Sequence, residues 1–120
     1  MVDEKTAIKI LEYNHHLMKG DLDKKREALV AIGRQVEPTF PKLKKYNPDL
    51  ESDIGFLLNQ LNIRHNNLEG MRKSEYLEKL NDKELEEWYD HTYDVLLYAI
   101  LTLNYMNLKQ EIKELKTKIN

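Results

Sequence analysis

The sequence predicts an all-α fold: a single-domain antiparallel helical bundle over residues 1–120, with four main helices, with or without a short fifth, and a long C-terminal helix. Three observations support this. Apolar residues recur three and four positions apart along most of the chain, the spacing of one helical face. Glycine and proline stand mainly between these segments, where helices end. Residues 95–108 (VLLYAILTLNYMNL) carry no charge although 33% of the chain is charged, as is typical of a helix surrounded by protein.

The first two predicted helices are joined by a short link at Gly20, so we expect them to lie antiparallel. Asp3 can cap the first helix, and Asp21 or Asp23 can begin the second. Ile8, Leu11, His15 and Met18 share one face of the first helix by their spacing, and Leu29, Ile32 and Val36 share one face of the second helix. The second helix is expected to end before Pro38.

Residues 37–47 (EPTFPKLKKYN) are predicted to be a loop, because Pro38 and Pro41 each remove a backbone donor and disfavour helix at the preceding residue. We expect Phe40, Leu43 and Tyr46 to hold this loop against the end of the bundle. The third helix has a clear start, with Asn47 as the cap and Pro48 at the first helical position. Its apolar stripe predicts that it ends at Gly70, and that stripe is Leu50, Ile54, Leu57, Leu58, Leu61, His65 and Leu68.

Gly33 and Gly55 fall inside predicted helices, beside the apolar stripes. Glycine within a helix costs roughly 1 kcal/mol relative to alanine. The two glycines therefore indicate either close helix crossings or simple tolerance. Deeply buried positions are expected mid-helix on the strongest stripes, at Leu57, Leu61, Leu96, Ala99 and Leu103.

A short helix over 71–80, capped by Ser74, and a last helix that begins at Asn81-Asp82 complete the predicted order. The last helix carries two offset apolar seams. The first is Leu85, Tyr89, Thr92, Leu96, Ala99, Leu103 and Met106, and the second is Leu101, Tyr105, Leu108, Ile112, Leu115 and Ile119. Their overlap explains the uncharged run, because two different faces are expected to be buried there.

The last helix is predicted to be longer than the others, at about 54 Å for 36 residues against about 22 to 32 Å. Something must therefore cover the seam formed by Leu108, Ile112, Leu115 and Ile119. Either the helix bends near Asn104 or Asn107 and folds back over the first two helices, or it stays straight and packs against a second copy. We expect the homodimer, because no proline or glycine follows residue 70.

Composition gives few indications of function. The net charge of −2 provides no general reason to bind nucleic acid or an anionic membrane. The chain has no cysteine, which excludes disulfides and thiolate chemistry, and its first residues are polar rather than a secretory signal, so we expect a cytoplasmic protein. Only the distribution of charge is uneven: +3 over 1–48, −7 over 49–94 and +2 over 95–120.

The acidic middle segment supports two different interpretations. One is an exposed negative surface that meets a basic partner or the chain's own basic segment, formed by Asp82, Glu84, Glu86, Glu87, Asp90 and Asp94. The other is a metal-dependent all-α enzyme that uses the carboxylates of residues 75–94. All-α nucleotide pyrophosphohydrolases hold magnesium with an ExxE and a later ExxD pair on neighbouring helices, but Glu84, Glu87 and Asp90 overlap on one helix, so this pattern does not match.

Histidines and lysines supply the remaining candidates. His15 and His65 lie on the apolar stripes of the first and third predicted helices, but the Glu-x-x-His motifs of di-iron bundles are absent, and adjacent His15-His16 point apart. His91 stands between Asp90 and Asp94, as a general base would, without any accompanying nucleophile. The basic loop Lys42, Lys44 and Lys45 suggests a nucleic-acid-associated protein as a further alternative.

The function that these observations predict is a small protein–protein interaction module without catalytic activity, such as a regulator, inhibitor, immunity factor or assembly subunit. We expect no cofactor, metal or membrane partner. The reasons are the missing catalytic motifs, the segregated acidic segment and the surplus of apolar surface on the last helix.

Overall fold

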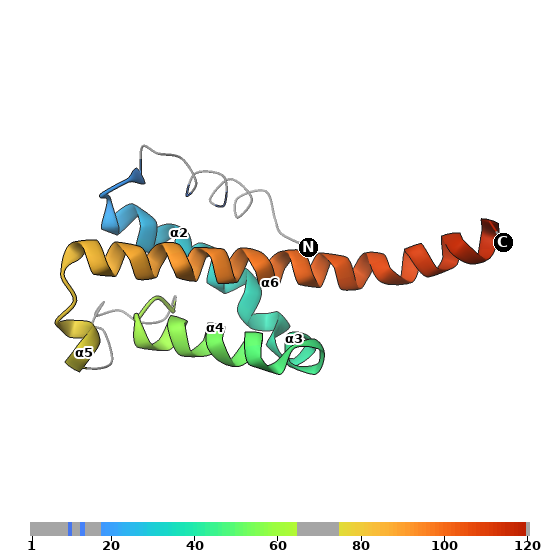
Figure 1. The fold of residues 1–120 in the computed structure, drawn as a ribbon, viewed down its shortest axis with the longest axis horizontal. Helices are drawn as coiled ribbons and strands as arrows, with labels where there is room; N and C mark the ends of the chain where they lie inside the picture. The colour runs from blue at the N-terminus through green and yellow to red at the C-terminus, as the bar shows by residue number, and fades with distance from the viewer. Residues whose placement is uncertain (1–9, 11–12, 14–17, 65–74, 120) are drawn as a thin grey trace.

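The computed structural model describes residues 10, 13, 18–64 and 75–119 of the chain (Figure 1). The described part is all-α and contains no strand. Its principal helices are α2 (Leu22–Val36), α4 (Pro48–Gln60) and α6 (Asp82–Ile119), and both α2 and α4 pack against the first half of α6. The predicted first helix, with Asp3, Ile8, Leu11 and His15, lies outside the described residues.

Helix α6 is a continuous element of 38 residues, which at about 1.5 Å per residue is about 57 Å long. The Asn81 side chain accepts a hydrogen bond from the N–H of Glu84, and the Glu84 side chain accepts one from the N–H of Asn81. This capping box confirms the predicted start. The helix continues without a break through Asn104 and Asn107, so the expected alternative of a bend that folds the tail back is wrong.

Helices α2 and α6 run in the same direction. Near the start of α2, Lys25 contacts Glu86 and Asp90 near the start of α6, whereas Val36 at the end of α2 lines a groove together with Ile100. Helix α4 runs the opposite way (Figure 1). The prediction of antiparallel neighbours therefore does not describe the α2–α6 pair.

A close approach between α2 and α4 occurs at Gly33. A Cβ at this position would lie 3.3 Å from Cδ2 of Leu58, closer than an ordinary van der Waals contact. The glycine therefore allows Leu58 to pack directly onto the α2 backbone, which is the predicted crossing. At Gly55 the nearest atom is Phe40 Cε2 at 4.0 Å, so no comparable crossing occurs there.

The predicted loop over 37–47 is helical, which corrects the interpretation of its two prolines. A short 3₁₀ helix, η2 (Glu37–Thr39), follows α2 and leads into α3 (Phe40–Tyr46). Pro38 and Pro41 each occupy a first-turn position, where the missing N–H would have no intrahelical acceptor. Leu43 is fully buried as expected, but Tyr46 is exposed.

Helix α4 starts as predicted but ends at Gln60 instead of Gly70. Its start is confirmed by the Asn47 side chain, which accepts a hydrogen bond from the N–H of Leu50. At its end, Asn62 adopts a φ of +59°, the N–H of Ile63 donates to Leu58, and that of Asn62 donates to Asn59. This is a Schellman motif with asparagine at the left-handed position. His65 and Leu68, assigned to this helix, lie outside the described residues.

The core joins α2, α3 and α4 to the first seam of α6. Of the five positions predicted to be deeply buried, Leu61, Leu96 and Ala99 are, whereas Leu57 and Leu103 are only half-buried. Within the described residues, the other fully buried aliphatic side chains are Ala28, Leu29, Ile32, Val36, Leu43, Ile54, Leu58 and Ile63. The predicted short helix near 71–80 appears as α5 (Glu75–Glu78), and its proposed cap, Ser74, lies outside the described residues.

Candidate functional site

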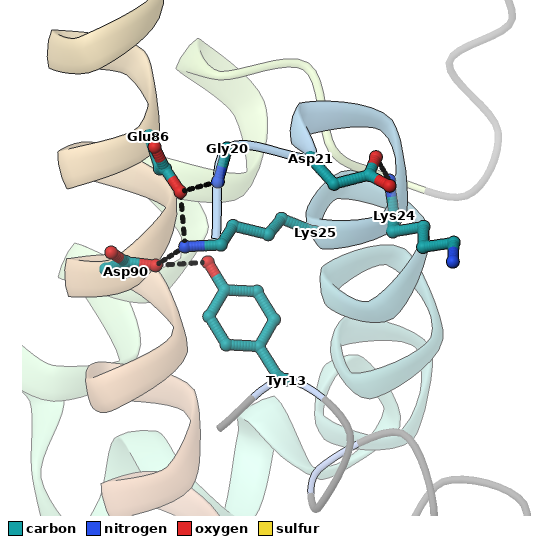
Figure 2. Close-up of polar contacts among 7 residues, drawn as sticks. All are labelled: Tyr13, Gly20, Asp21, Lys24, Lys25, Glu86 and Asp90. Carbon is teal, nitrogen blue, oxygen red and sulfur yellow. Dashed lines mark hydrogen bonds and ion pairs between the residues drawn. The ribbon is translucent and has the colours of Figure 1, made fainter. Parts of the chain in front are cut away.

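A buried lysine links the beginning of the described chain to α6 (Figure 2). Lys25 is only 6% exposed, and its Nζ lies 2.8 Å from Glu86 Oε2 and 2.7 Å from Asp90 Oδ1. The Tyr13 hydroxyl donates to the same Asp90 oxygen at 2.8 Å, and the N–H of Gly20 donates to Glu86 at 2.7 Å. We call these five residues, Tyr13, Gly20, Lys25, Glu86 and Asp90, the Lys25 cluster.

Local geometry explains how these groups come together. Gly20 has a φ of +82°, which glycine adopts without steric cost, and this conformation confirms the predicted turn before α2. The Asp21 side chain then caps α2 by accepting from the N–H of Lys24. Glu86 and Asp90 are four residues apart in α6 and therefore share a helical face. That spacing is the one sequence signal that could have indicated a shared cation.

The electrostatics of the Lys25 cluster keep Lys25 and Glu86 charged and Tyr13 protonated. Burial alone lowers the pKa of Lys25, but the hydrogen bonds to Asp90 and Glu86 outweigh it and raise the pKa above its ordinary value. The Lys25 hydrogen bond, followed by the Gly20 N–H, lowers the pKa of Glu86. Burial, then the bond to Asp90, raises the pKa of Tyr13 far above its usual range. A tyrosine and a lysine held in these protonated states suit a structural clamp better than acid–base catalysis.

Aromatic contacts extend this clamp. The Tyr13 ring stacks on Tyr93 with centroids 4.4 Å apart, and Lys25 Nζ lies 5.3 Å from the Tyr13 ring centroid. The Tyr93 hydroxyl donates to the carbonyl of Ile10 at 2.9 Å. Residues 10 and 13 are thereby attached to the face of α6 that carries Asp90.

The structure separates the six predicted acidic residues into different roles. Glu86 and Asp90 belong to the Lys25 cluster, and Glu84 forms the capping box. The remaining three, Asp82, Glu87 and Asp94, are exposed. Within the described residues, Glu86 and Asp90 form their ion pairs with Lys25 of α2, whereas one expectation placed the basic 42–45 segment there.

The suggested Asp90–His91–Asp94 arrangement does not form. Asp90 is bonded to Lys25 and Tyr13, while the His91 ring packs edge-on against Trp88 with centroids 5.4 Å apart. Within the described residues, no three histidine or acidic side chains lie close enough together to hold a metal ion. His15, His16 and His65 lie outside the described residues.

The three lysines of the predicted basic loop instead lie on α3. All three are exposed, and Lys42 Nζ donates to Asn107 Oδ1 of α6 at 3.0 Å. This bond crosses a groove of about 550 Å³ between the end of α2, η2, the start of α3 and the middle of α6. Apolar residues that line the groove are Val36, Ile100, Leu101, Leu103 and Leu108, and its polar residues are Gln35, Thr39, Lys42, Asn104, Asn107 and Glu111.

Beyond this groove, α6 extends past the other helices, and every residue from 107 to 119 is exposed (Figure 1). Large apolar side chains follow one line along this surface. We call this line the apolar strip: Tyr98, Leu101, Tyr105, Leu108, Ile112, Leu115 and Ile119. Their exposed fractions run from 42% at Ile112 to 74% at Ile119. The expectation that residues 95–108 are surrounded on most sides is therefore wrong for this chain alone.

The chain was compared with protein-family models, with curated proteins and with solved structures, and none of the three comparisons gave a match. Among the described helices, none combines the length and the apolar content needed to cross a membrane. The candidate site is therefore defined by geometry alone, as the apolar strip and the groove that shares Leu101 and Leu108 with it.

Proposed function

We propose that this protein is a non-catalytic protein–protein interaction module, and that its contact surface is the apolar strip of α6. The observation that carries the proposal is the row of seven large apolar side chains, each at least 42% exposed. Contiguous apolar surface of this kind is uncommon on monomeric proteins and marks places where another protein binds. Tyrosine, present at two positions of the strip, is also enriched at interfaces.

The other helices supply the scaffold in this proposal. Helices α2 and α4 both pack on the buried face of α6, which leaves the opposite face for a partner. The exposed acidic residues Glu87 and Asp94 continue the line of the apolar strip toward the start of α6. A partner with an apolar contact face bordered by basic groups would match both parts of this line. By binding such a partner, the protein would act as a regulator, an inhibitor, an immunity factor or an assembly subunit.

Photo-cross-linking tests the proposal directly. Ile112 on the apolar strip and Thr117 on the other side of the helix would each be replaced by p-benzoylphenylalanine in cells of the source organism. We expect cross-linked species, identified by mass spectrometry, from position 112 and few from position 117. Equal cross-linking at both positions, or none at 112, would reject the apolar strip as a contact surface.

The two other function classes have separate tests. Retention on heparin that falls with salt would favour a nucleic-acid partner for the α3 lysines. Copurifying metal, with a chelator lowering the melting temperature, would favour the metal-dependent enzyme.

Replacing Glu87 and Asp94 by lysine tests whether these two exposed carboxylates contribute to partner binding. The double variant changes no residue of the Lys25 cluster. We expect this double variant to slow association with a basic partner.

A further inference from the structure

The apolar strip has the spacing of a coiled-coil seam. Its residues are separated alternately by three and four positions, over three heptads from Tyr98 to Ile119. Tyr98, Tyr105, Ile112 and Ile119 occupy the a positions, and the d positions are Leu101, Leu108 and Leu115. All seven side chains are exposed in the single chain, so the whole seam is open to a partner helix.

We propose that the occupant of this seam is a second copy of the chain, and that the two α6 helices form a parallel, in-register coiled coil over residues 98–119. This rests on the proposed function, because it takes the apolar strip to be a contact surface. The residue types support two parallel strands: isoleucine at a with leucine at d, as in Ile112 and Leu115, is the combination that favours parallel dimers.

The charges beside the seam favour the same orientation. Glu111 occupies a g position, and Lys116 occupies the e position of the next heptad. In a parallel dimer each g residue faces the e residue of the following heptad on the other chain, so Glu111 meets Lys116 twice by symmetry. In an antiparallel dimer e residues face each other and g residues face each other, so Glu111 would attract Lys118 but the e residues Lys109 and Lys116 would repel. Only the parallel pairing has no repulsive contact of this kind.

The rest of the molecule leaves room for this arrangement. At roughly 100° per residue, the apolar strip lies roughly 160° around α6 from the face that packs on α2 and α4. The second copy therefore approaches from the side opposite the buried face, along the edge of the groove that Leu101 and Leu108 line together with Val36 and Lys42. The seam ends at Asp94, an exposed residue four positions before Tyr98 that places a carboxylate at the preceding d position. Two such carboxylates facing each other would limit the coiled coil to residues 98–119.

Size exclusion coupled to light scattering tests the dimer itself. The chain has a mass of 14.3 kDa, and we expect about twice that mass at high micromolar concentration. Ile112→Glu should give a monomer with nearly unchanged helical circular dichroism. Thr117→Glu, which adds the same charge at an f position, should remain dimeric. A wild-type monomer at high micromolar concentration would overturn the proposal, and cross-links to a different protein would then leave the proposed function standing.

Two further measurements test the orientation. Because the chain has no cysteine, Leu101→Cys and Leu115→Cys can be oxidised as separate single variants. A parallel in-register pair should form an intermolecular disulfide at both positions. An antiparallel pair can bring at most one of them opposite itself, so a disulfide at only one position would overturn the orientation.

Lys116→Glu gives an independent readout. In the parallel dimer it replaces two Glu111–Lys116 attractions with repulsions, and the dissociation constant should rise roughly tenfold at low salt. In the antiparallel dimer it would remove the repulsion with Lys109 and tighten association. Adding Glu111→Lys to the variant should restore the parallel dimer, because the pairing charges are then exchanged. Tighter association of Lys116→Glu would refute the parallel arrangement.

Discussion

Replacing Lys25 by methionine should destabilise the fold by about 1–3 kcal/mol. The change keeps most of the aliphatic volume but removes the cation that Glu86 and Asp90 share. Hydrogen bonds to charged groups contribute about 1.5–3 kcal/mol when buried, whereas exposed ion pairs contribute about 0.2–1 kcal/mol. The Glu86 side chain is 20% exposed and that of Asp90 is 49% exposed. The Lys25–Glu86 bond should therefore account for most of the lost stability.

Urea unfolding followed by circular dichroism at 222 nm measures this loss, at one fixed protein concentration because association would shift the midpoint. Lys24→Met is the matched control, since it makes the same chemical change one residue away. The Lys24 side chain is exposed and points away from the Lys25 cluster (Figure 2). If Lys25→Met and Lys24→Met unfold at the same urea concentration, the Lys25 cluster does not stabilise the fold.

The pH dependence of the stability difference between wild type and Lys25→Met gives a second check. The pKa of Glu86 is lower in the folded state than its ordinary value of 4.5, so its contribution is complete above pH 4.5 and lost as pH falls through the folded pKa. The pKa of Lys25 is raised above 10.5, so its contribution is complete below that pH and lost as pH rises through the folded pKa. The gap between wild type and Lys25→Met should be widest between these limits and narrow below pH 4.5. A gap that stays constant into strong acid would refute this account.

Three further predictions concern the fold. Leu61→Ala and Leu96→Ala should each lower the free energy of unfolding in urea by about 2–5 kcal/mol, because both side chains are buried. Phe56→Ala, at an exposed site, should lower it far less. Losses below about 1 kcal/mol for both leucine variants would contradict the core assignment. Asn62→Ala should lower the free energy of unfolding by about 1–2 kcal/mol, because alanine disfavours the φ of +59°, and Asn62→Gly should lower it less. If glycine destabilises more than alanine, the Schellman motif is not the reason for the asparagine. Asn81→Ala should cost about 0.5–2 kcal/mol and speed amide exchange in the first turn of α6, and unchanged exchange there would argue against the capping box.

Features set by local sequence were predictable, and those set by distant contacts were not. The starts of α4 and α6 follow from Asn47-Pro48 and from the Asn81–Glu84 capping box, in which the decisive groups are neighbours in the chain. The first seam of α6 was correctly assigned to the core because its spacing is regular over three heptads. The Lys25 cluster could not be predicted, since its hydrogen bonds join residues more than 60 positions apart.

The errors also have physical causes. Proline was interpreted as a helix breaker at Pro38 and Pro41, but both lie in first turns, where proline fits a helix. The end of α4 was missed because asparagine, rather than glycine, takes the left-handed conformation at Asn62. The predicted stripe continues past Asn62, from Leu61 to His65 and Leu68, so the sequence still looks helical although α4 has ended.

The two seams of α6 can coexist because a heptad repeat drifts on a straight helix. An apolar residue every 3.5 positions falls behind the 3.6-residue turn by about 20° per heptad. A straight helix can therefore keep one heptad seam against a fixed partner for only a few heptads, and the first seam spans three, from Leu85 to Met106. The apolar strip starts on nearly the opposite side at Tyr98, before the first seam has ended. The uncharged run at residues 95–108 is this overlap: the stretch where one helix is apolar on its core face and on the apolar strip at the same time.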